Sequence, residues 1–305
     1  CSVDICDQVH PVREWAGEAT LLNWLEDYPF IGVLGGAGFL GRRYWQRLYR
    51  LHRFISHARR SGRLLMVLHN RRPHMVRGFG RLLAGPLLSY LRWRSDEVIV
   101  HSPAPPLTGL KNYVPHPLFP VELGRGGGRL SADAGALCFG RIVPSKRFEE
   151  LIAIWPAEPA LRIAGKCPDP VYQRQLEQAA ANRAVAIEPH FLTAEELDAR
   201  LRCESIVVVP RGDDQALVSG TFFLALSYGC CVIARRTPAM VRFAERFEYL
   251  ALYEDAVTLQ AALLTIRKKL GAGLTRCDVR AAAERQFSDA AVVAALLPLL
   301  EGSRA

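Results

Sequence analysis

Two cationic side chains follow a short apolar run near the middle of the chain. Arg141 lies directly behind that run, and Lys146 follows close to Pro144, a residue that favours the first turn of a helix. Cations beside the free amides of a helix N-terminus form a binding site for a diphosphate. The stretch 136–155 therefore predicts a strand, a turn at Gly140 and a helix, with an anion site where the strand ends.

The same half of the chain repeats this arrangement. Gly165 and Lys166 form a turn at the end of a second predicted strand, and Phe191 and Leu192 follow a third. A further strand leads through a polar loop to a helix that starts at Ser219-Gly220-Thr221. Each turn follows the carboxyl end of a strand, the edge of a parallel sheet at which ligands bind.

A glycine-rich loop in the first half suggests different chemistry. Gly36-Ala37-Gly38-Phe39-Leu40-Gly41 fits the G-x-G-x-x-G pattern of dinucleotide-binding domains. The next strand, however, ends in His69-Asn70-Arg71-Arg72, which offers no carboxylate to a ribose, although an arginine can accept the 2′-phosphate of NADP. No tyrosine has a lysine four residues later, as the catalytic pair of the extended short-chain dehydrogenases requires. An NADP-dependent oxidoreductase stays an alternative, and we expect Gly35, Gly36 and Gly38 to line a cleft between domains.

Alternating strand and helix patterns must position these groups. They predict the α/β class, with two doubly wound parallel sheets that face a cleft. The composition changes over the glycine-rich stretch 120–135, and we assign a linker to 123–135 within it. This linker separates a first domain at 1–122 from a second at 136–285. A C-terminal helix at 286–305 is expected to pack back on the first domain. Strands are predicted at 30–34, 64–69, 97–101, 137–139, 161–164, 185–188, 206–209 and 231–234, and helices at 42–58, 144–155, 170–182, 194–203 and 220–228.

Composition narrows the classes of protein. Half of the 305 residues are hydrophobic and no apolar run reaches the length of a membrane span, about 18 residues, so the sequence predicts a globular protein. Its net charge of +9 suits anionic lipid, nucleic acid or a phosphorylated substrate, unless the arginine excess only reflects genome composition. Eight scattered cysteines without C-x-x-C pairs favour a reducing cytoplasm. The chain begins without Met, which favours a truncated N-terminus over a processed lipoprotein.

The segment 42–63 mixes arginines with Tyr44, Trp45, Tyr49 and Phe54. It predicts a basic amphipathic helix that lies on anionic lipid at the inner face of the plasma membrane. An ordinary crossover helix with an arginine-rich outer face is the alternative. No recognised module supports nucleic-acid binding, and no histidine or cysteine spacing indicates a metal site.

Taken in order, the motifs of the second half resemble the GT-B glycosyltransferases, above all the glycosyltransferase family 4-like group. The resemblance covers 136–245 well and 60–120 faintly, and some details are most similar to bacterial exopolysaccharide glycosyltransferases, including β-mannosyltransferases. It rests on three runs, which are Phe139-Gly140-Arg141 through Lys146, Ile163-Ala164-Gly165, and Leu226-Ser227-Tyr228-Gly229 through Val232-Ile233-Ala234, with Cys231 where the family has Pro.

The resemblance implies roles for these residues. Arg141 and Lys146 would bind the donor diphosphate and offset charge on the departing nucleotide without a metal. The backbone around Phe191 and Leu192 would contact the nucleobase. The turn at Ser219-Gly220-Thr221 would present amides and hydroxyls to phosphate or sugar.

One departure concerns the mechanism. Retaining members carry Glu-x7-Glu, whereas Ala216 and Leu224 occupy the matching positions here. An inverting mechanism instead requires a general base that deprotonates the acceptor hydroxyl. The candidates are His69, His74 and His10, with Asp213 and Asp214 in the second domain.

The sequence therefore predicts a cytoplasmic glycosyltransferase that needs no cofactor. Its donor would be a nucleotide sugar, GDP-mannose first and a UDP-sugar second, and its acceptor a glycolipid or polysaccharide intermediate. A non-catalytic sugar-nucleotide-binding relative is the further alternative.

Overall fold

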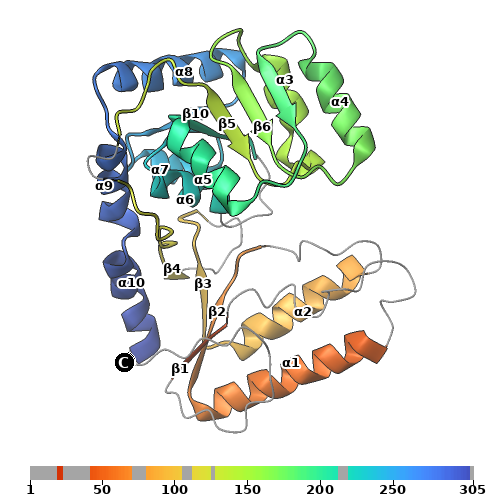
Figure 1. Ribbon diagram of the computed structural model, residues 1–305. Helices are drawn as coiled ribbons and strands as arrows, with labels where there is room; N and C mark the ends of the chain where they lie inside the picture. The colour runs from red at the N-terminus through yellow and green to blue at the C-terminus, as the bar shows by residue number, and fades with distance from the viewer. Residues whose placement is uncertain are drawn as a thin grey trace. The chain divides into compact units, whose positions relative to one another are not determined.

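The computed structural model describes residues 19–22, 42–70, 80–104, 112–124, 128–211 and 219–302. The chain divides into two compact units (Figure 1). Unit 1 comprises 1–114, 215–218 and 293–305, and unit 2 comprises 115–214 and 219–292. The predicted strand at 30–34 and the glycine-rich loop lie outside the described residues.

Unit 1 contains a parallel sheet in the order β1-β2-β3-β4. Since the strands follow one another in chain order, right-handed crossovers put the two connecting helices on the same face of the sheet (Figure 1). These helices and strand β2 bury an apolar core between them, which includes Leu51, Ile55, Leu64, Met66 and Leu91. The elements are β1 (Ala19–Leu22), α1 (Arg42–Ser61), β2 (Arg63–Val67), α2 (Gly80–Arg94), β3 (Glu97–Val100) and β4 (Asn112–Tyr113).

Unit 2 contains a six-stranded parallel sheet in the order β10-β9-β8-β5-β6-β7. The chain runs outward from β5 in one direction and from β8 in the other, so the strand order reverses between β5 and β8. Ligands of open α/β sheets bind at the carboxyl ends of the strands at such a switch point. The strands are β5 (Ala136–Phe139), β6 (Leu161–Ala164), β7 (Val185–Glu188), β8 (Ile206–Val209), β9 (Cys231–Arg235) and β10 (Leu250–Tyr253).

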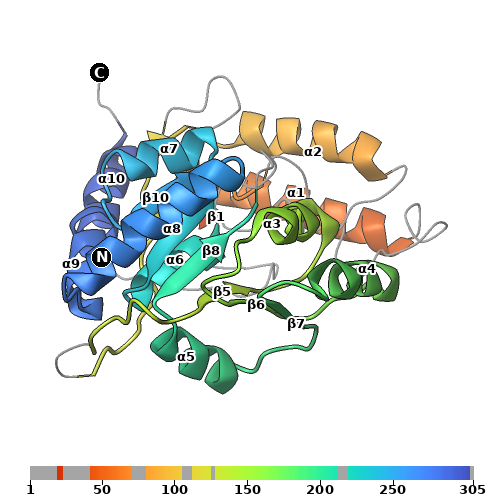
Figure 2. The same cartoon turned by 90° about the horizontal axis from the view of Figure 1, so that it is seen from above.

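Helices cover both faces of this sheet, with α3 and α5 on opposite sides (Figure 2). Side-chain caps fix where several of them start, as at Thr193, whose hydroxyl and Glu196 form a capping box. The helices are η3 (Pro144–Lys146), α3 (Phe148–Ile154), α4 (Pro170–Ala180), α5 (Ala194–Cys203), α6 (Gly220–Ser227), α7 (Pro238–Ala244), α8 (Ala256–Gly271), α9 (Arg276–Phe287) and α10 (Asp289–Glu301).

The predicted α/β class with parallel sheets is confirmed, and three strands have the predicted bounds. The single helix predicted over 144–155 is wrong in one respect. A short 3-10 helix carries Lys146, and α3 begins only after Arg147, which adopts a left-handed conformation with φ 54°. This break separates the lysine from the helix that follows. Neither β1 nor β10 was predicted.

Candidate functional site

The carboxyl edge of the unit 2 sheet is built on two glycines in close contact. Gly165 has φ +145°, and a Cβ at this position would lie 2.1 Å from the carbonyl oxygen of Gly140. Gly140 itself has φ +97°, a backbone conformation that residues with a Cβ rarely adopt. The Gly140 amide also donates to Ala164 O at 3.1 Å. The turns after β5 and β6 are therefore locked together, and each requires glycine.

Lys146 extends its ammonium group over this turn. The Nζ atom donates to Phe139 O at 3.4 Å, and a Cβ on Gly140 would lie 3.2 Å from Nζ and 3.9 Å from the Thr221 hydroxyl oxygen. A cation from η3, a bare backbone turn and a hydroxyl from α6 therefore surround the same point. This point lies at the strand switch, since Gly140 follows β5 and Thr221 belongs to the helix after β8.

Burial disfavours the charged form of the lysine. It lowers the pKa of Lys146 from its ordinary value to about 8, an effect that the nearby positive charge of Arg211 reinforces. An incoming diphosphate would reverse this shift, because it would place negative charge beside the ammonium. The lysine is thus placed to gain a large electrostatic interaction on anion binding.

The N-terminus of α6 adds hydrogen-bond donors to the same place. Ser219 caps the helix and accepts a hydrogen bond from the Phe222 amide at 3.3 Å. The first amides of a helix have no partner within it, and those of Gly220 and Thr221 have none among the described residues, so they can donate to an anion.

The other predicted donor residues have solvent-exposed side chains. Arg141 and Lys166 are exposed, and Arg141 has no ion-pair partner in the part of the chain that the structure describes. Phe191 is 73% exposed in the loop after β7, with Leu192 half-buried beside it. The structure therefore brings Gly140, Lys146, Gly165 and Thr221 together, with Ser219 and Gly220 beside Thr221 at the start of α6. The side chains of Arg141, Lys166 and Phe191 are exposed.

Arg211 is a site residue that the sequence reasoning missed. It follows β8 and interacts electrostatically with Lys146. The signal was present, because an arginine directly after a strand is the same feature that identified Arg141. Two cations near one turn strengthen the case for an anionic ligand.

The carboxyl edge of the unit 1 sheet carries buried polar side chains. His69 and Asn70 follow β2, and His101 and Ser102 follow β3; all four are at most 9% exposed. The rings of His69 and His101 lie 5.5 Å apart between centroids, and His101 Nδ1 donates to Val114 O at 2.8 Å. His69 was predicted as a general base, whereas His101 was missed.

Several predicted residues cannot be placed in this geometry. His10, His74, Asp213, Asp214, Gly35, Gly36 and Gly38 lie outside the described residues. Within the described ranges, no group of three or more His, Cys, Asp or Glu side chains could hold a metal ion. Nor is any described helix long and apolar enough to cross a membrane.

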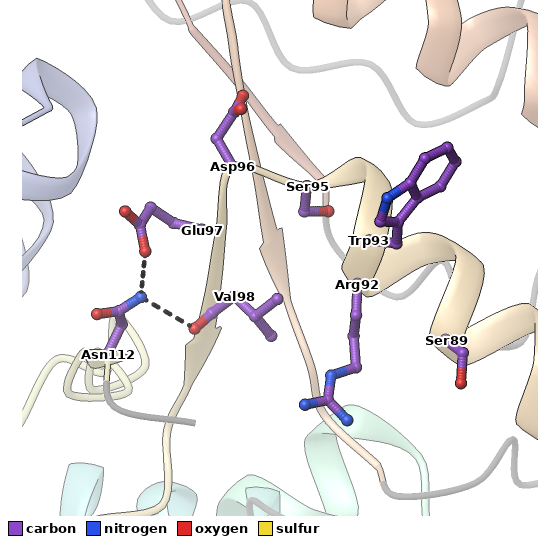
Figure 3. A pocket seen from close by; sticks show the side chains of 8 residues that line it. All are labelled: Ser89, Arg92, Trp93, Ser95, Asp96, Glu97, Val98 and Asn112. Carbon is purple, nitrogen blue, oxygen red and sulfur yellow. Dashed lines mark hydrogen bonds between the residues drawn. The ribbon is translucent and has the colours of Figure 1, made fainter. Parts of the chain in front are cut away.

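Unit 1 also has a cavity of about 430 Å³ beside the end of α2, shown in Figure 3. Several of its polar groups are already hydrogen-bonded within the protein. Asn112 Nδ2 donates to the Glu97 carboxylate at 2.6 Å, and Asp96 accepts from the Leu64 amide at 2.8 Å. None of the predicted site residues lines it, so we do not assign the functional site to this cavity.

Comparison with solved structures identifies the fold. A mutant of TarM from S. aureus, in complex with fondaparinux, alpha-GlcNAc-glycerol and UDP, matches with a TM-score of 0.58 and 14% identity over 79% of this chain and 51% of its own. Sucrose-phosphate synthase from Thermosynechococcus elongatus matches with a TM-score of 0.58 and 18% identity over 93% of this chain and 73% of its own. HepE from Anabaena, in complex with UDP, gives a TM-score of 0.59 and 17% identity over 84% and 75%.

The chain therefore has the fold of GT-B glycosyltransferases, as the resemblance predicted, and spans about half the length of TarM. The sequence matches no family model, and no curated protein matches it.

Proposed function

We propose that this protein is a glycosyltransferase that binds a nucleotide sugar at the carboxyl edge of the unit 2 sheet. The observation that carries the proposal is the meeting of the Lys146 ammonium, the Gly140 turn and the Thr221 hydroxyl at the strand switch. Preorganised cations and amides of this kind stabilise the charge that develops on a departing diphosphate. Arg211 and the exposed Arg141 would add to that stabilisation.

The donor is a nucleoside diphosphate sugar. UDP is bound in the matching structures of TarM and HepE, which supports this class of ligand. GDP-mannose is the donor that the sequence resemblance favours, and a UDP-sugar is the alternative. The proposed acceptor is a lipid-linked or polysaccharide intermediate.

His69 is the proposed general base. Its ring would take the proton of the acceptor hydroxyl while the hydroxyl oxygen attacks the anomeric carbon and the bond to the diphosphate oxygen breaks. Histidine suits this task because its pKa lies near neutral pH. Leu224 stands on α6 where retaining relatives carry a glutamate, so this base-assisted route with inversion is the one that the present residues support.

Ligand binding tests the donor site directly. We expect UDP or GDP to raise the thermal unfolding temperature, and Arg141→Ala and Lys146→Met to weaken that effect. Arg174→Ala is the matched control, because Arg174 is an exposed arginine of α4. Stabilisation by NADP alone would favour an oxidoreductase that uses the loop at 36–41 and would refute the proposal.

Turnover tests the base. His69→Ala should leave nucleotide affinity unchanged and reduce sugar transfer to a lipid extract by about 100-fold or more, the usual contribution of general base catalysis. Leu224 in place of a glutamate also fits a non-catalytic sugar-nucleotide-binding relative. Tight nucleotide binding without donor hydrolysis or transfer would establish that second function.

We propose further that the protein works at the inner face of the plasma membrane, where a lipid-linked acceptor would lie.

A further inference from the structure

Helices α1 and α2 carry charge of one sign only. Together they contain ten arginines, and neither has an aspartate or glutamate. Surface helices of soluble proteins usually mix both signs along their exposed face. A pair of neighbouring helices with only arginines therefore indicates a negatively charged partner.

Large aromatic side chains are exposed on the same two helices. Trp45 is 52% exposed, Tyr49 61% and Trp93 72%. Among the described residues, only Phe119 and Phe191 are other aromatic side chains with comparable exposure. The opposite sides of α1 and α2 carry the buried leucines of the unit 1 core. The aromatic rings are thus additional to that core, on the side directed to solvent.

Side-chain contacts join the two helices into one surface. His52 Nδ1 and the Tyr90 hydroxyl are hydrogen-bonded at 2.6 Å, and Arg59 donates to Arg94 O at 3.0 Å. The Tyr90 and Trp93 rings lie 6.3 Å apart between centroids. In Figure 3 the Trp93 ring projects from α2 on the side away from Glu97 and Asn112. Tyr90 and Trp93 therefore form one surface with α1, and Trp93 also lines the cavity beside α2.

Most of the described arginines on α1 and α2 form no ion pair within the described residues. Arg59 forms an ion pair with Asp96, with an Nη2–Oδ1 distance of 3.7 Å. Arg50, Arg53 and Arg60 are exposed and have no ion pair within the described ranges, and the Arg53 guanidinium lies 5.9 Å from the Tyr49 ring centre. Positive charge and aromatic rings are therefore interleaved on the surface.

We propose that this aromatic–arginine surface, formed by Trp45, Tyr49, His52, Arg53, Tyr90, Trp93 and their neighbouring arginines, docks on an anionic phospholipid bilayer. Indole and phenol rings partition into the headgroup region of a bilayer, and arginines pair with lipid phosphates. The inference rests on the part of the proposed function that places the acceptor in a membrane. It names unit 1 as the unit that contacts the lipid.

Vesicle binding tests the proposal on the full chain. We expect cosedimentation with vesicles that contain one third phosphatidylglycerol, little with phosphatidylcholine alone, and release at high salt. Replacing Arg50, Arg53 and Arg60 with alanine should lower the partition coefficient by about 100-fold, since each arginine near an anionic surface contributes about fivefold. Trp45→Ala with Trp93→Ala should lower it by at least tenfold. The matched control replaces Arg174, Arg183 and Arg246, three exposed arginines of unit 2 without ion pairs within the described residues.

Two further measurements, the unfolding temperature and the nucleotide affinity, distinguish a failure of this proposal from a failure of the proposed donor site. All variants should retain the wild-type unfolding temperature and UDP or GDP affinity, because the surface lies on unit 1. Equal vesicle binding by wild type and the surface variants would overturn the proposal. So would binding to single-stranded RNA without binding to vesicles, because bases stack on the same rings and phosphates pair with the same arginines.

Discussion

The candidate sites at the carboxyl edges of the two sheets are built from different groups, mainly backbone turns in unit 2 and side chains in unit 1. In unit 2, two glycine turns that follow different strands and a lysine from η3 create the proposed anion site. In unit 1, buried polar side chains from separate strands form the cluster around His69 and His101. A site made of backbone tolerates little change in geometry, whereas a side-chain cluster depends on how strands pair. The two edges should therefore respond differently to substitution.

The largest effect should come from Gly165→Ala. The added Cβ would meet the Gly140 carbonyl at 2.1 Å, and alanine is strained at φ +145°. We expect the free energy of unfolding of unit 2 to fall by about 3 kcal/mol or more, measured by denaturant titration.

Gly271→Ala is the control for that substitution. Gly271 ends α8, and a Cβ there would meet nothing within 4 Å. Its effect should stay within about 1 kcal/mol and be stabilising, because alanine favours a helix more than glycine does. Equal stability of the two variants would show that the contact between Gly140 and Gly165 is not required.

Lys146→Met should change nucleotide affinity and protein stability in opposite directions. We expect nucleoside diphosphate affinity to fall about 100-fold, since a hydrogen bond to a charged group contributes about 1.5–3 kcal/mol. The free protein should instead gain about 1 kcal/mol of stability, because burial disfavours the ammonium and lowers its pKa.

Calorimetric titration and thermal unfolding measure the two effects. Lys268→Met removes an exposed lysine of α8 and should change neither quantity. A Lys146→Met variant that binds nucleotide normally and unfolds more easily would assign the lysine a purely structural role.

The pH dependence of binding should reveal the same lysine. Its pKa in the free protein is about 8, below the ordinary value, so the ammonium loses its proton as the pH rises through 8. An anionic donor prefers the charged form, and affinity should be flat below pH 8 and fall by up to tenfold per pH unit above it. Burial raises the pKa of the Cys138 thiol, which therefore stays neutral over this range.

Lys146→Arg is the control, because a guanidinium does not titrate in this window. Its affinity should lose the dependence on pH that the wild type shows.

The free energy of unfolding of the ligand-free wild type should increase with pH, whereas its nucleotide affinity decreases. This free energy should rise between the folded pKa, about 8, and the unfolded pKa, 10.5, as the cost of a buried charge disappears. A wild type whose affinity does not change up to pH 9 would contradict this account.

The contrast between the two edges also explains what the sequence could predict. Gly140, Lys146, Gly165 and Thr221 were found because strand ends, glycine turns and helix starts are local patterns. His101 was missed because its importance comes from the pairing of β2 with β3, which brings it to His69. The strand at Leu250–Tyr253 was missed because a run of four apolar residues does not distinguish a strand from a helix.

The smallest effect should come from His101 in unit 1. His101→Phe keeps a ring beside His69 but loses the hydrogen bond from Nδ1 to Val114 O, which leaves that buried carbonyl without this donor. We expect unit 1 to lose about 1–2 kcal/mol of stability, and sugar transfer to slow severalfold through the position of His69, with nucleotide affinity unchanged. His101→Asn should restore part of both, because the amide nitrogen of asparagine can occupy the place of Nδ1. Stability recovered by asparagine without any recovery of kcat would show that His101 supports the fold of unit 1 but does not position His69.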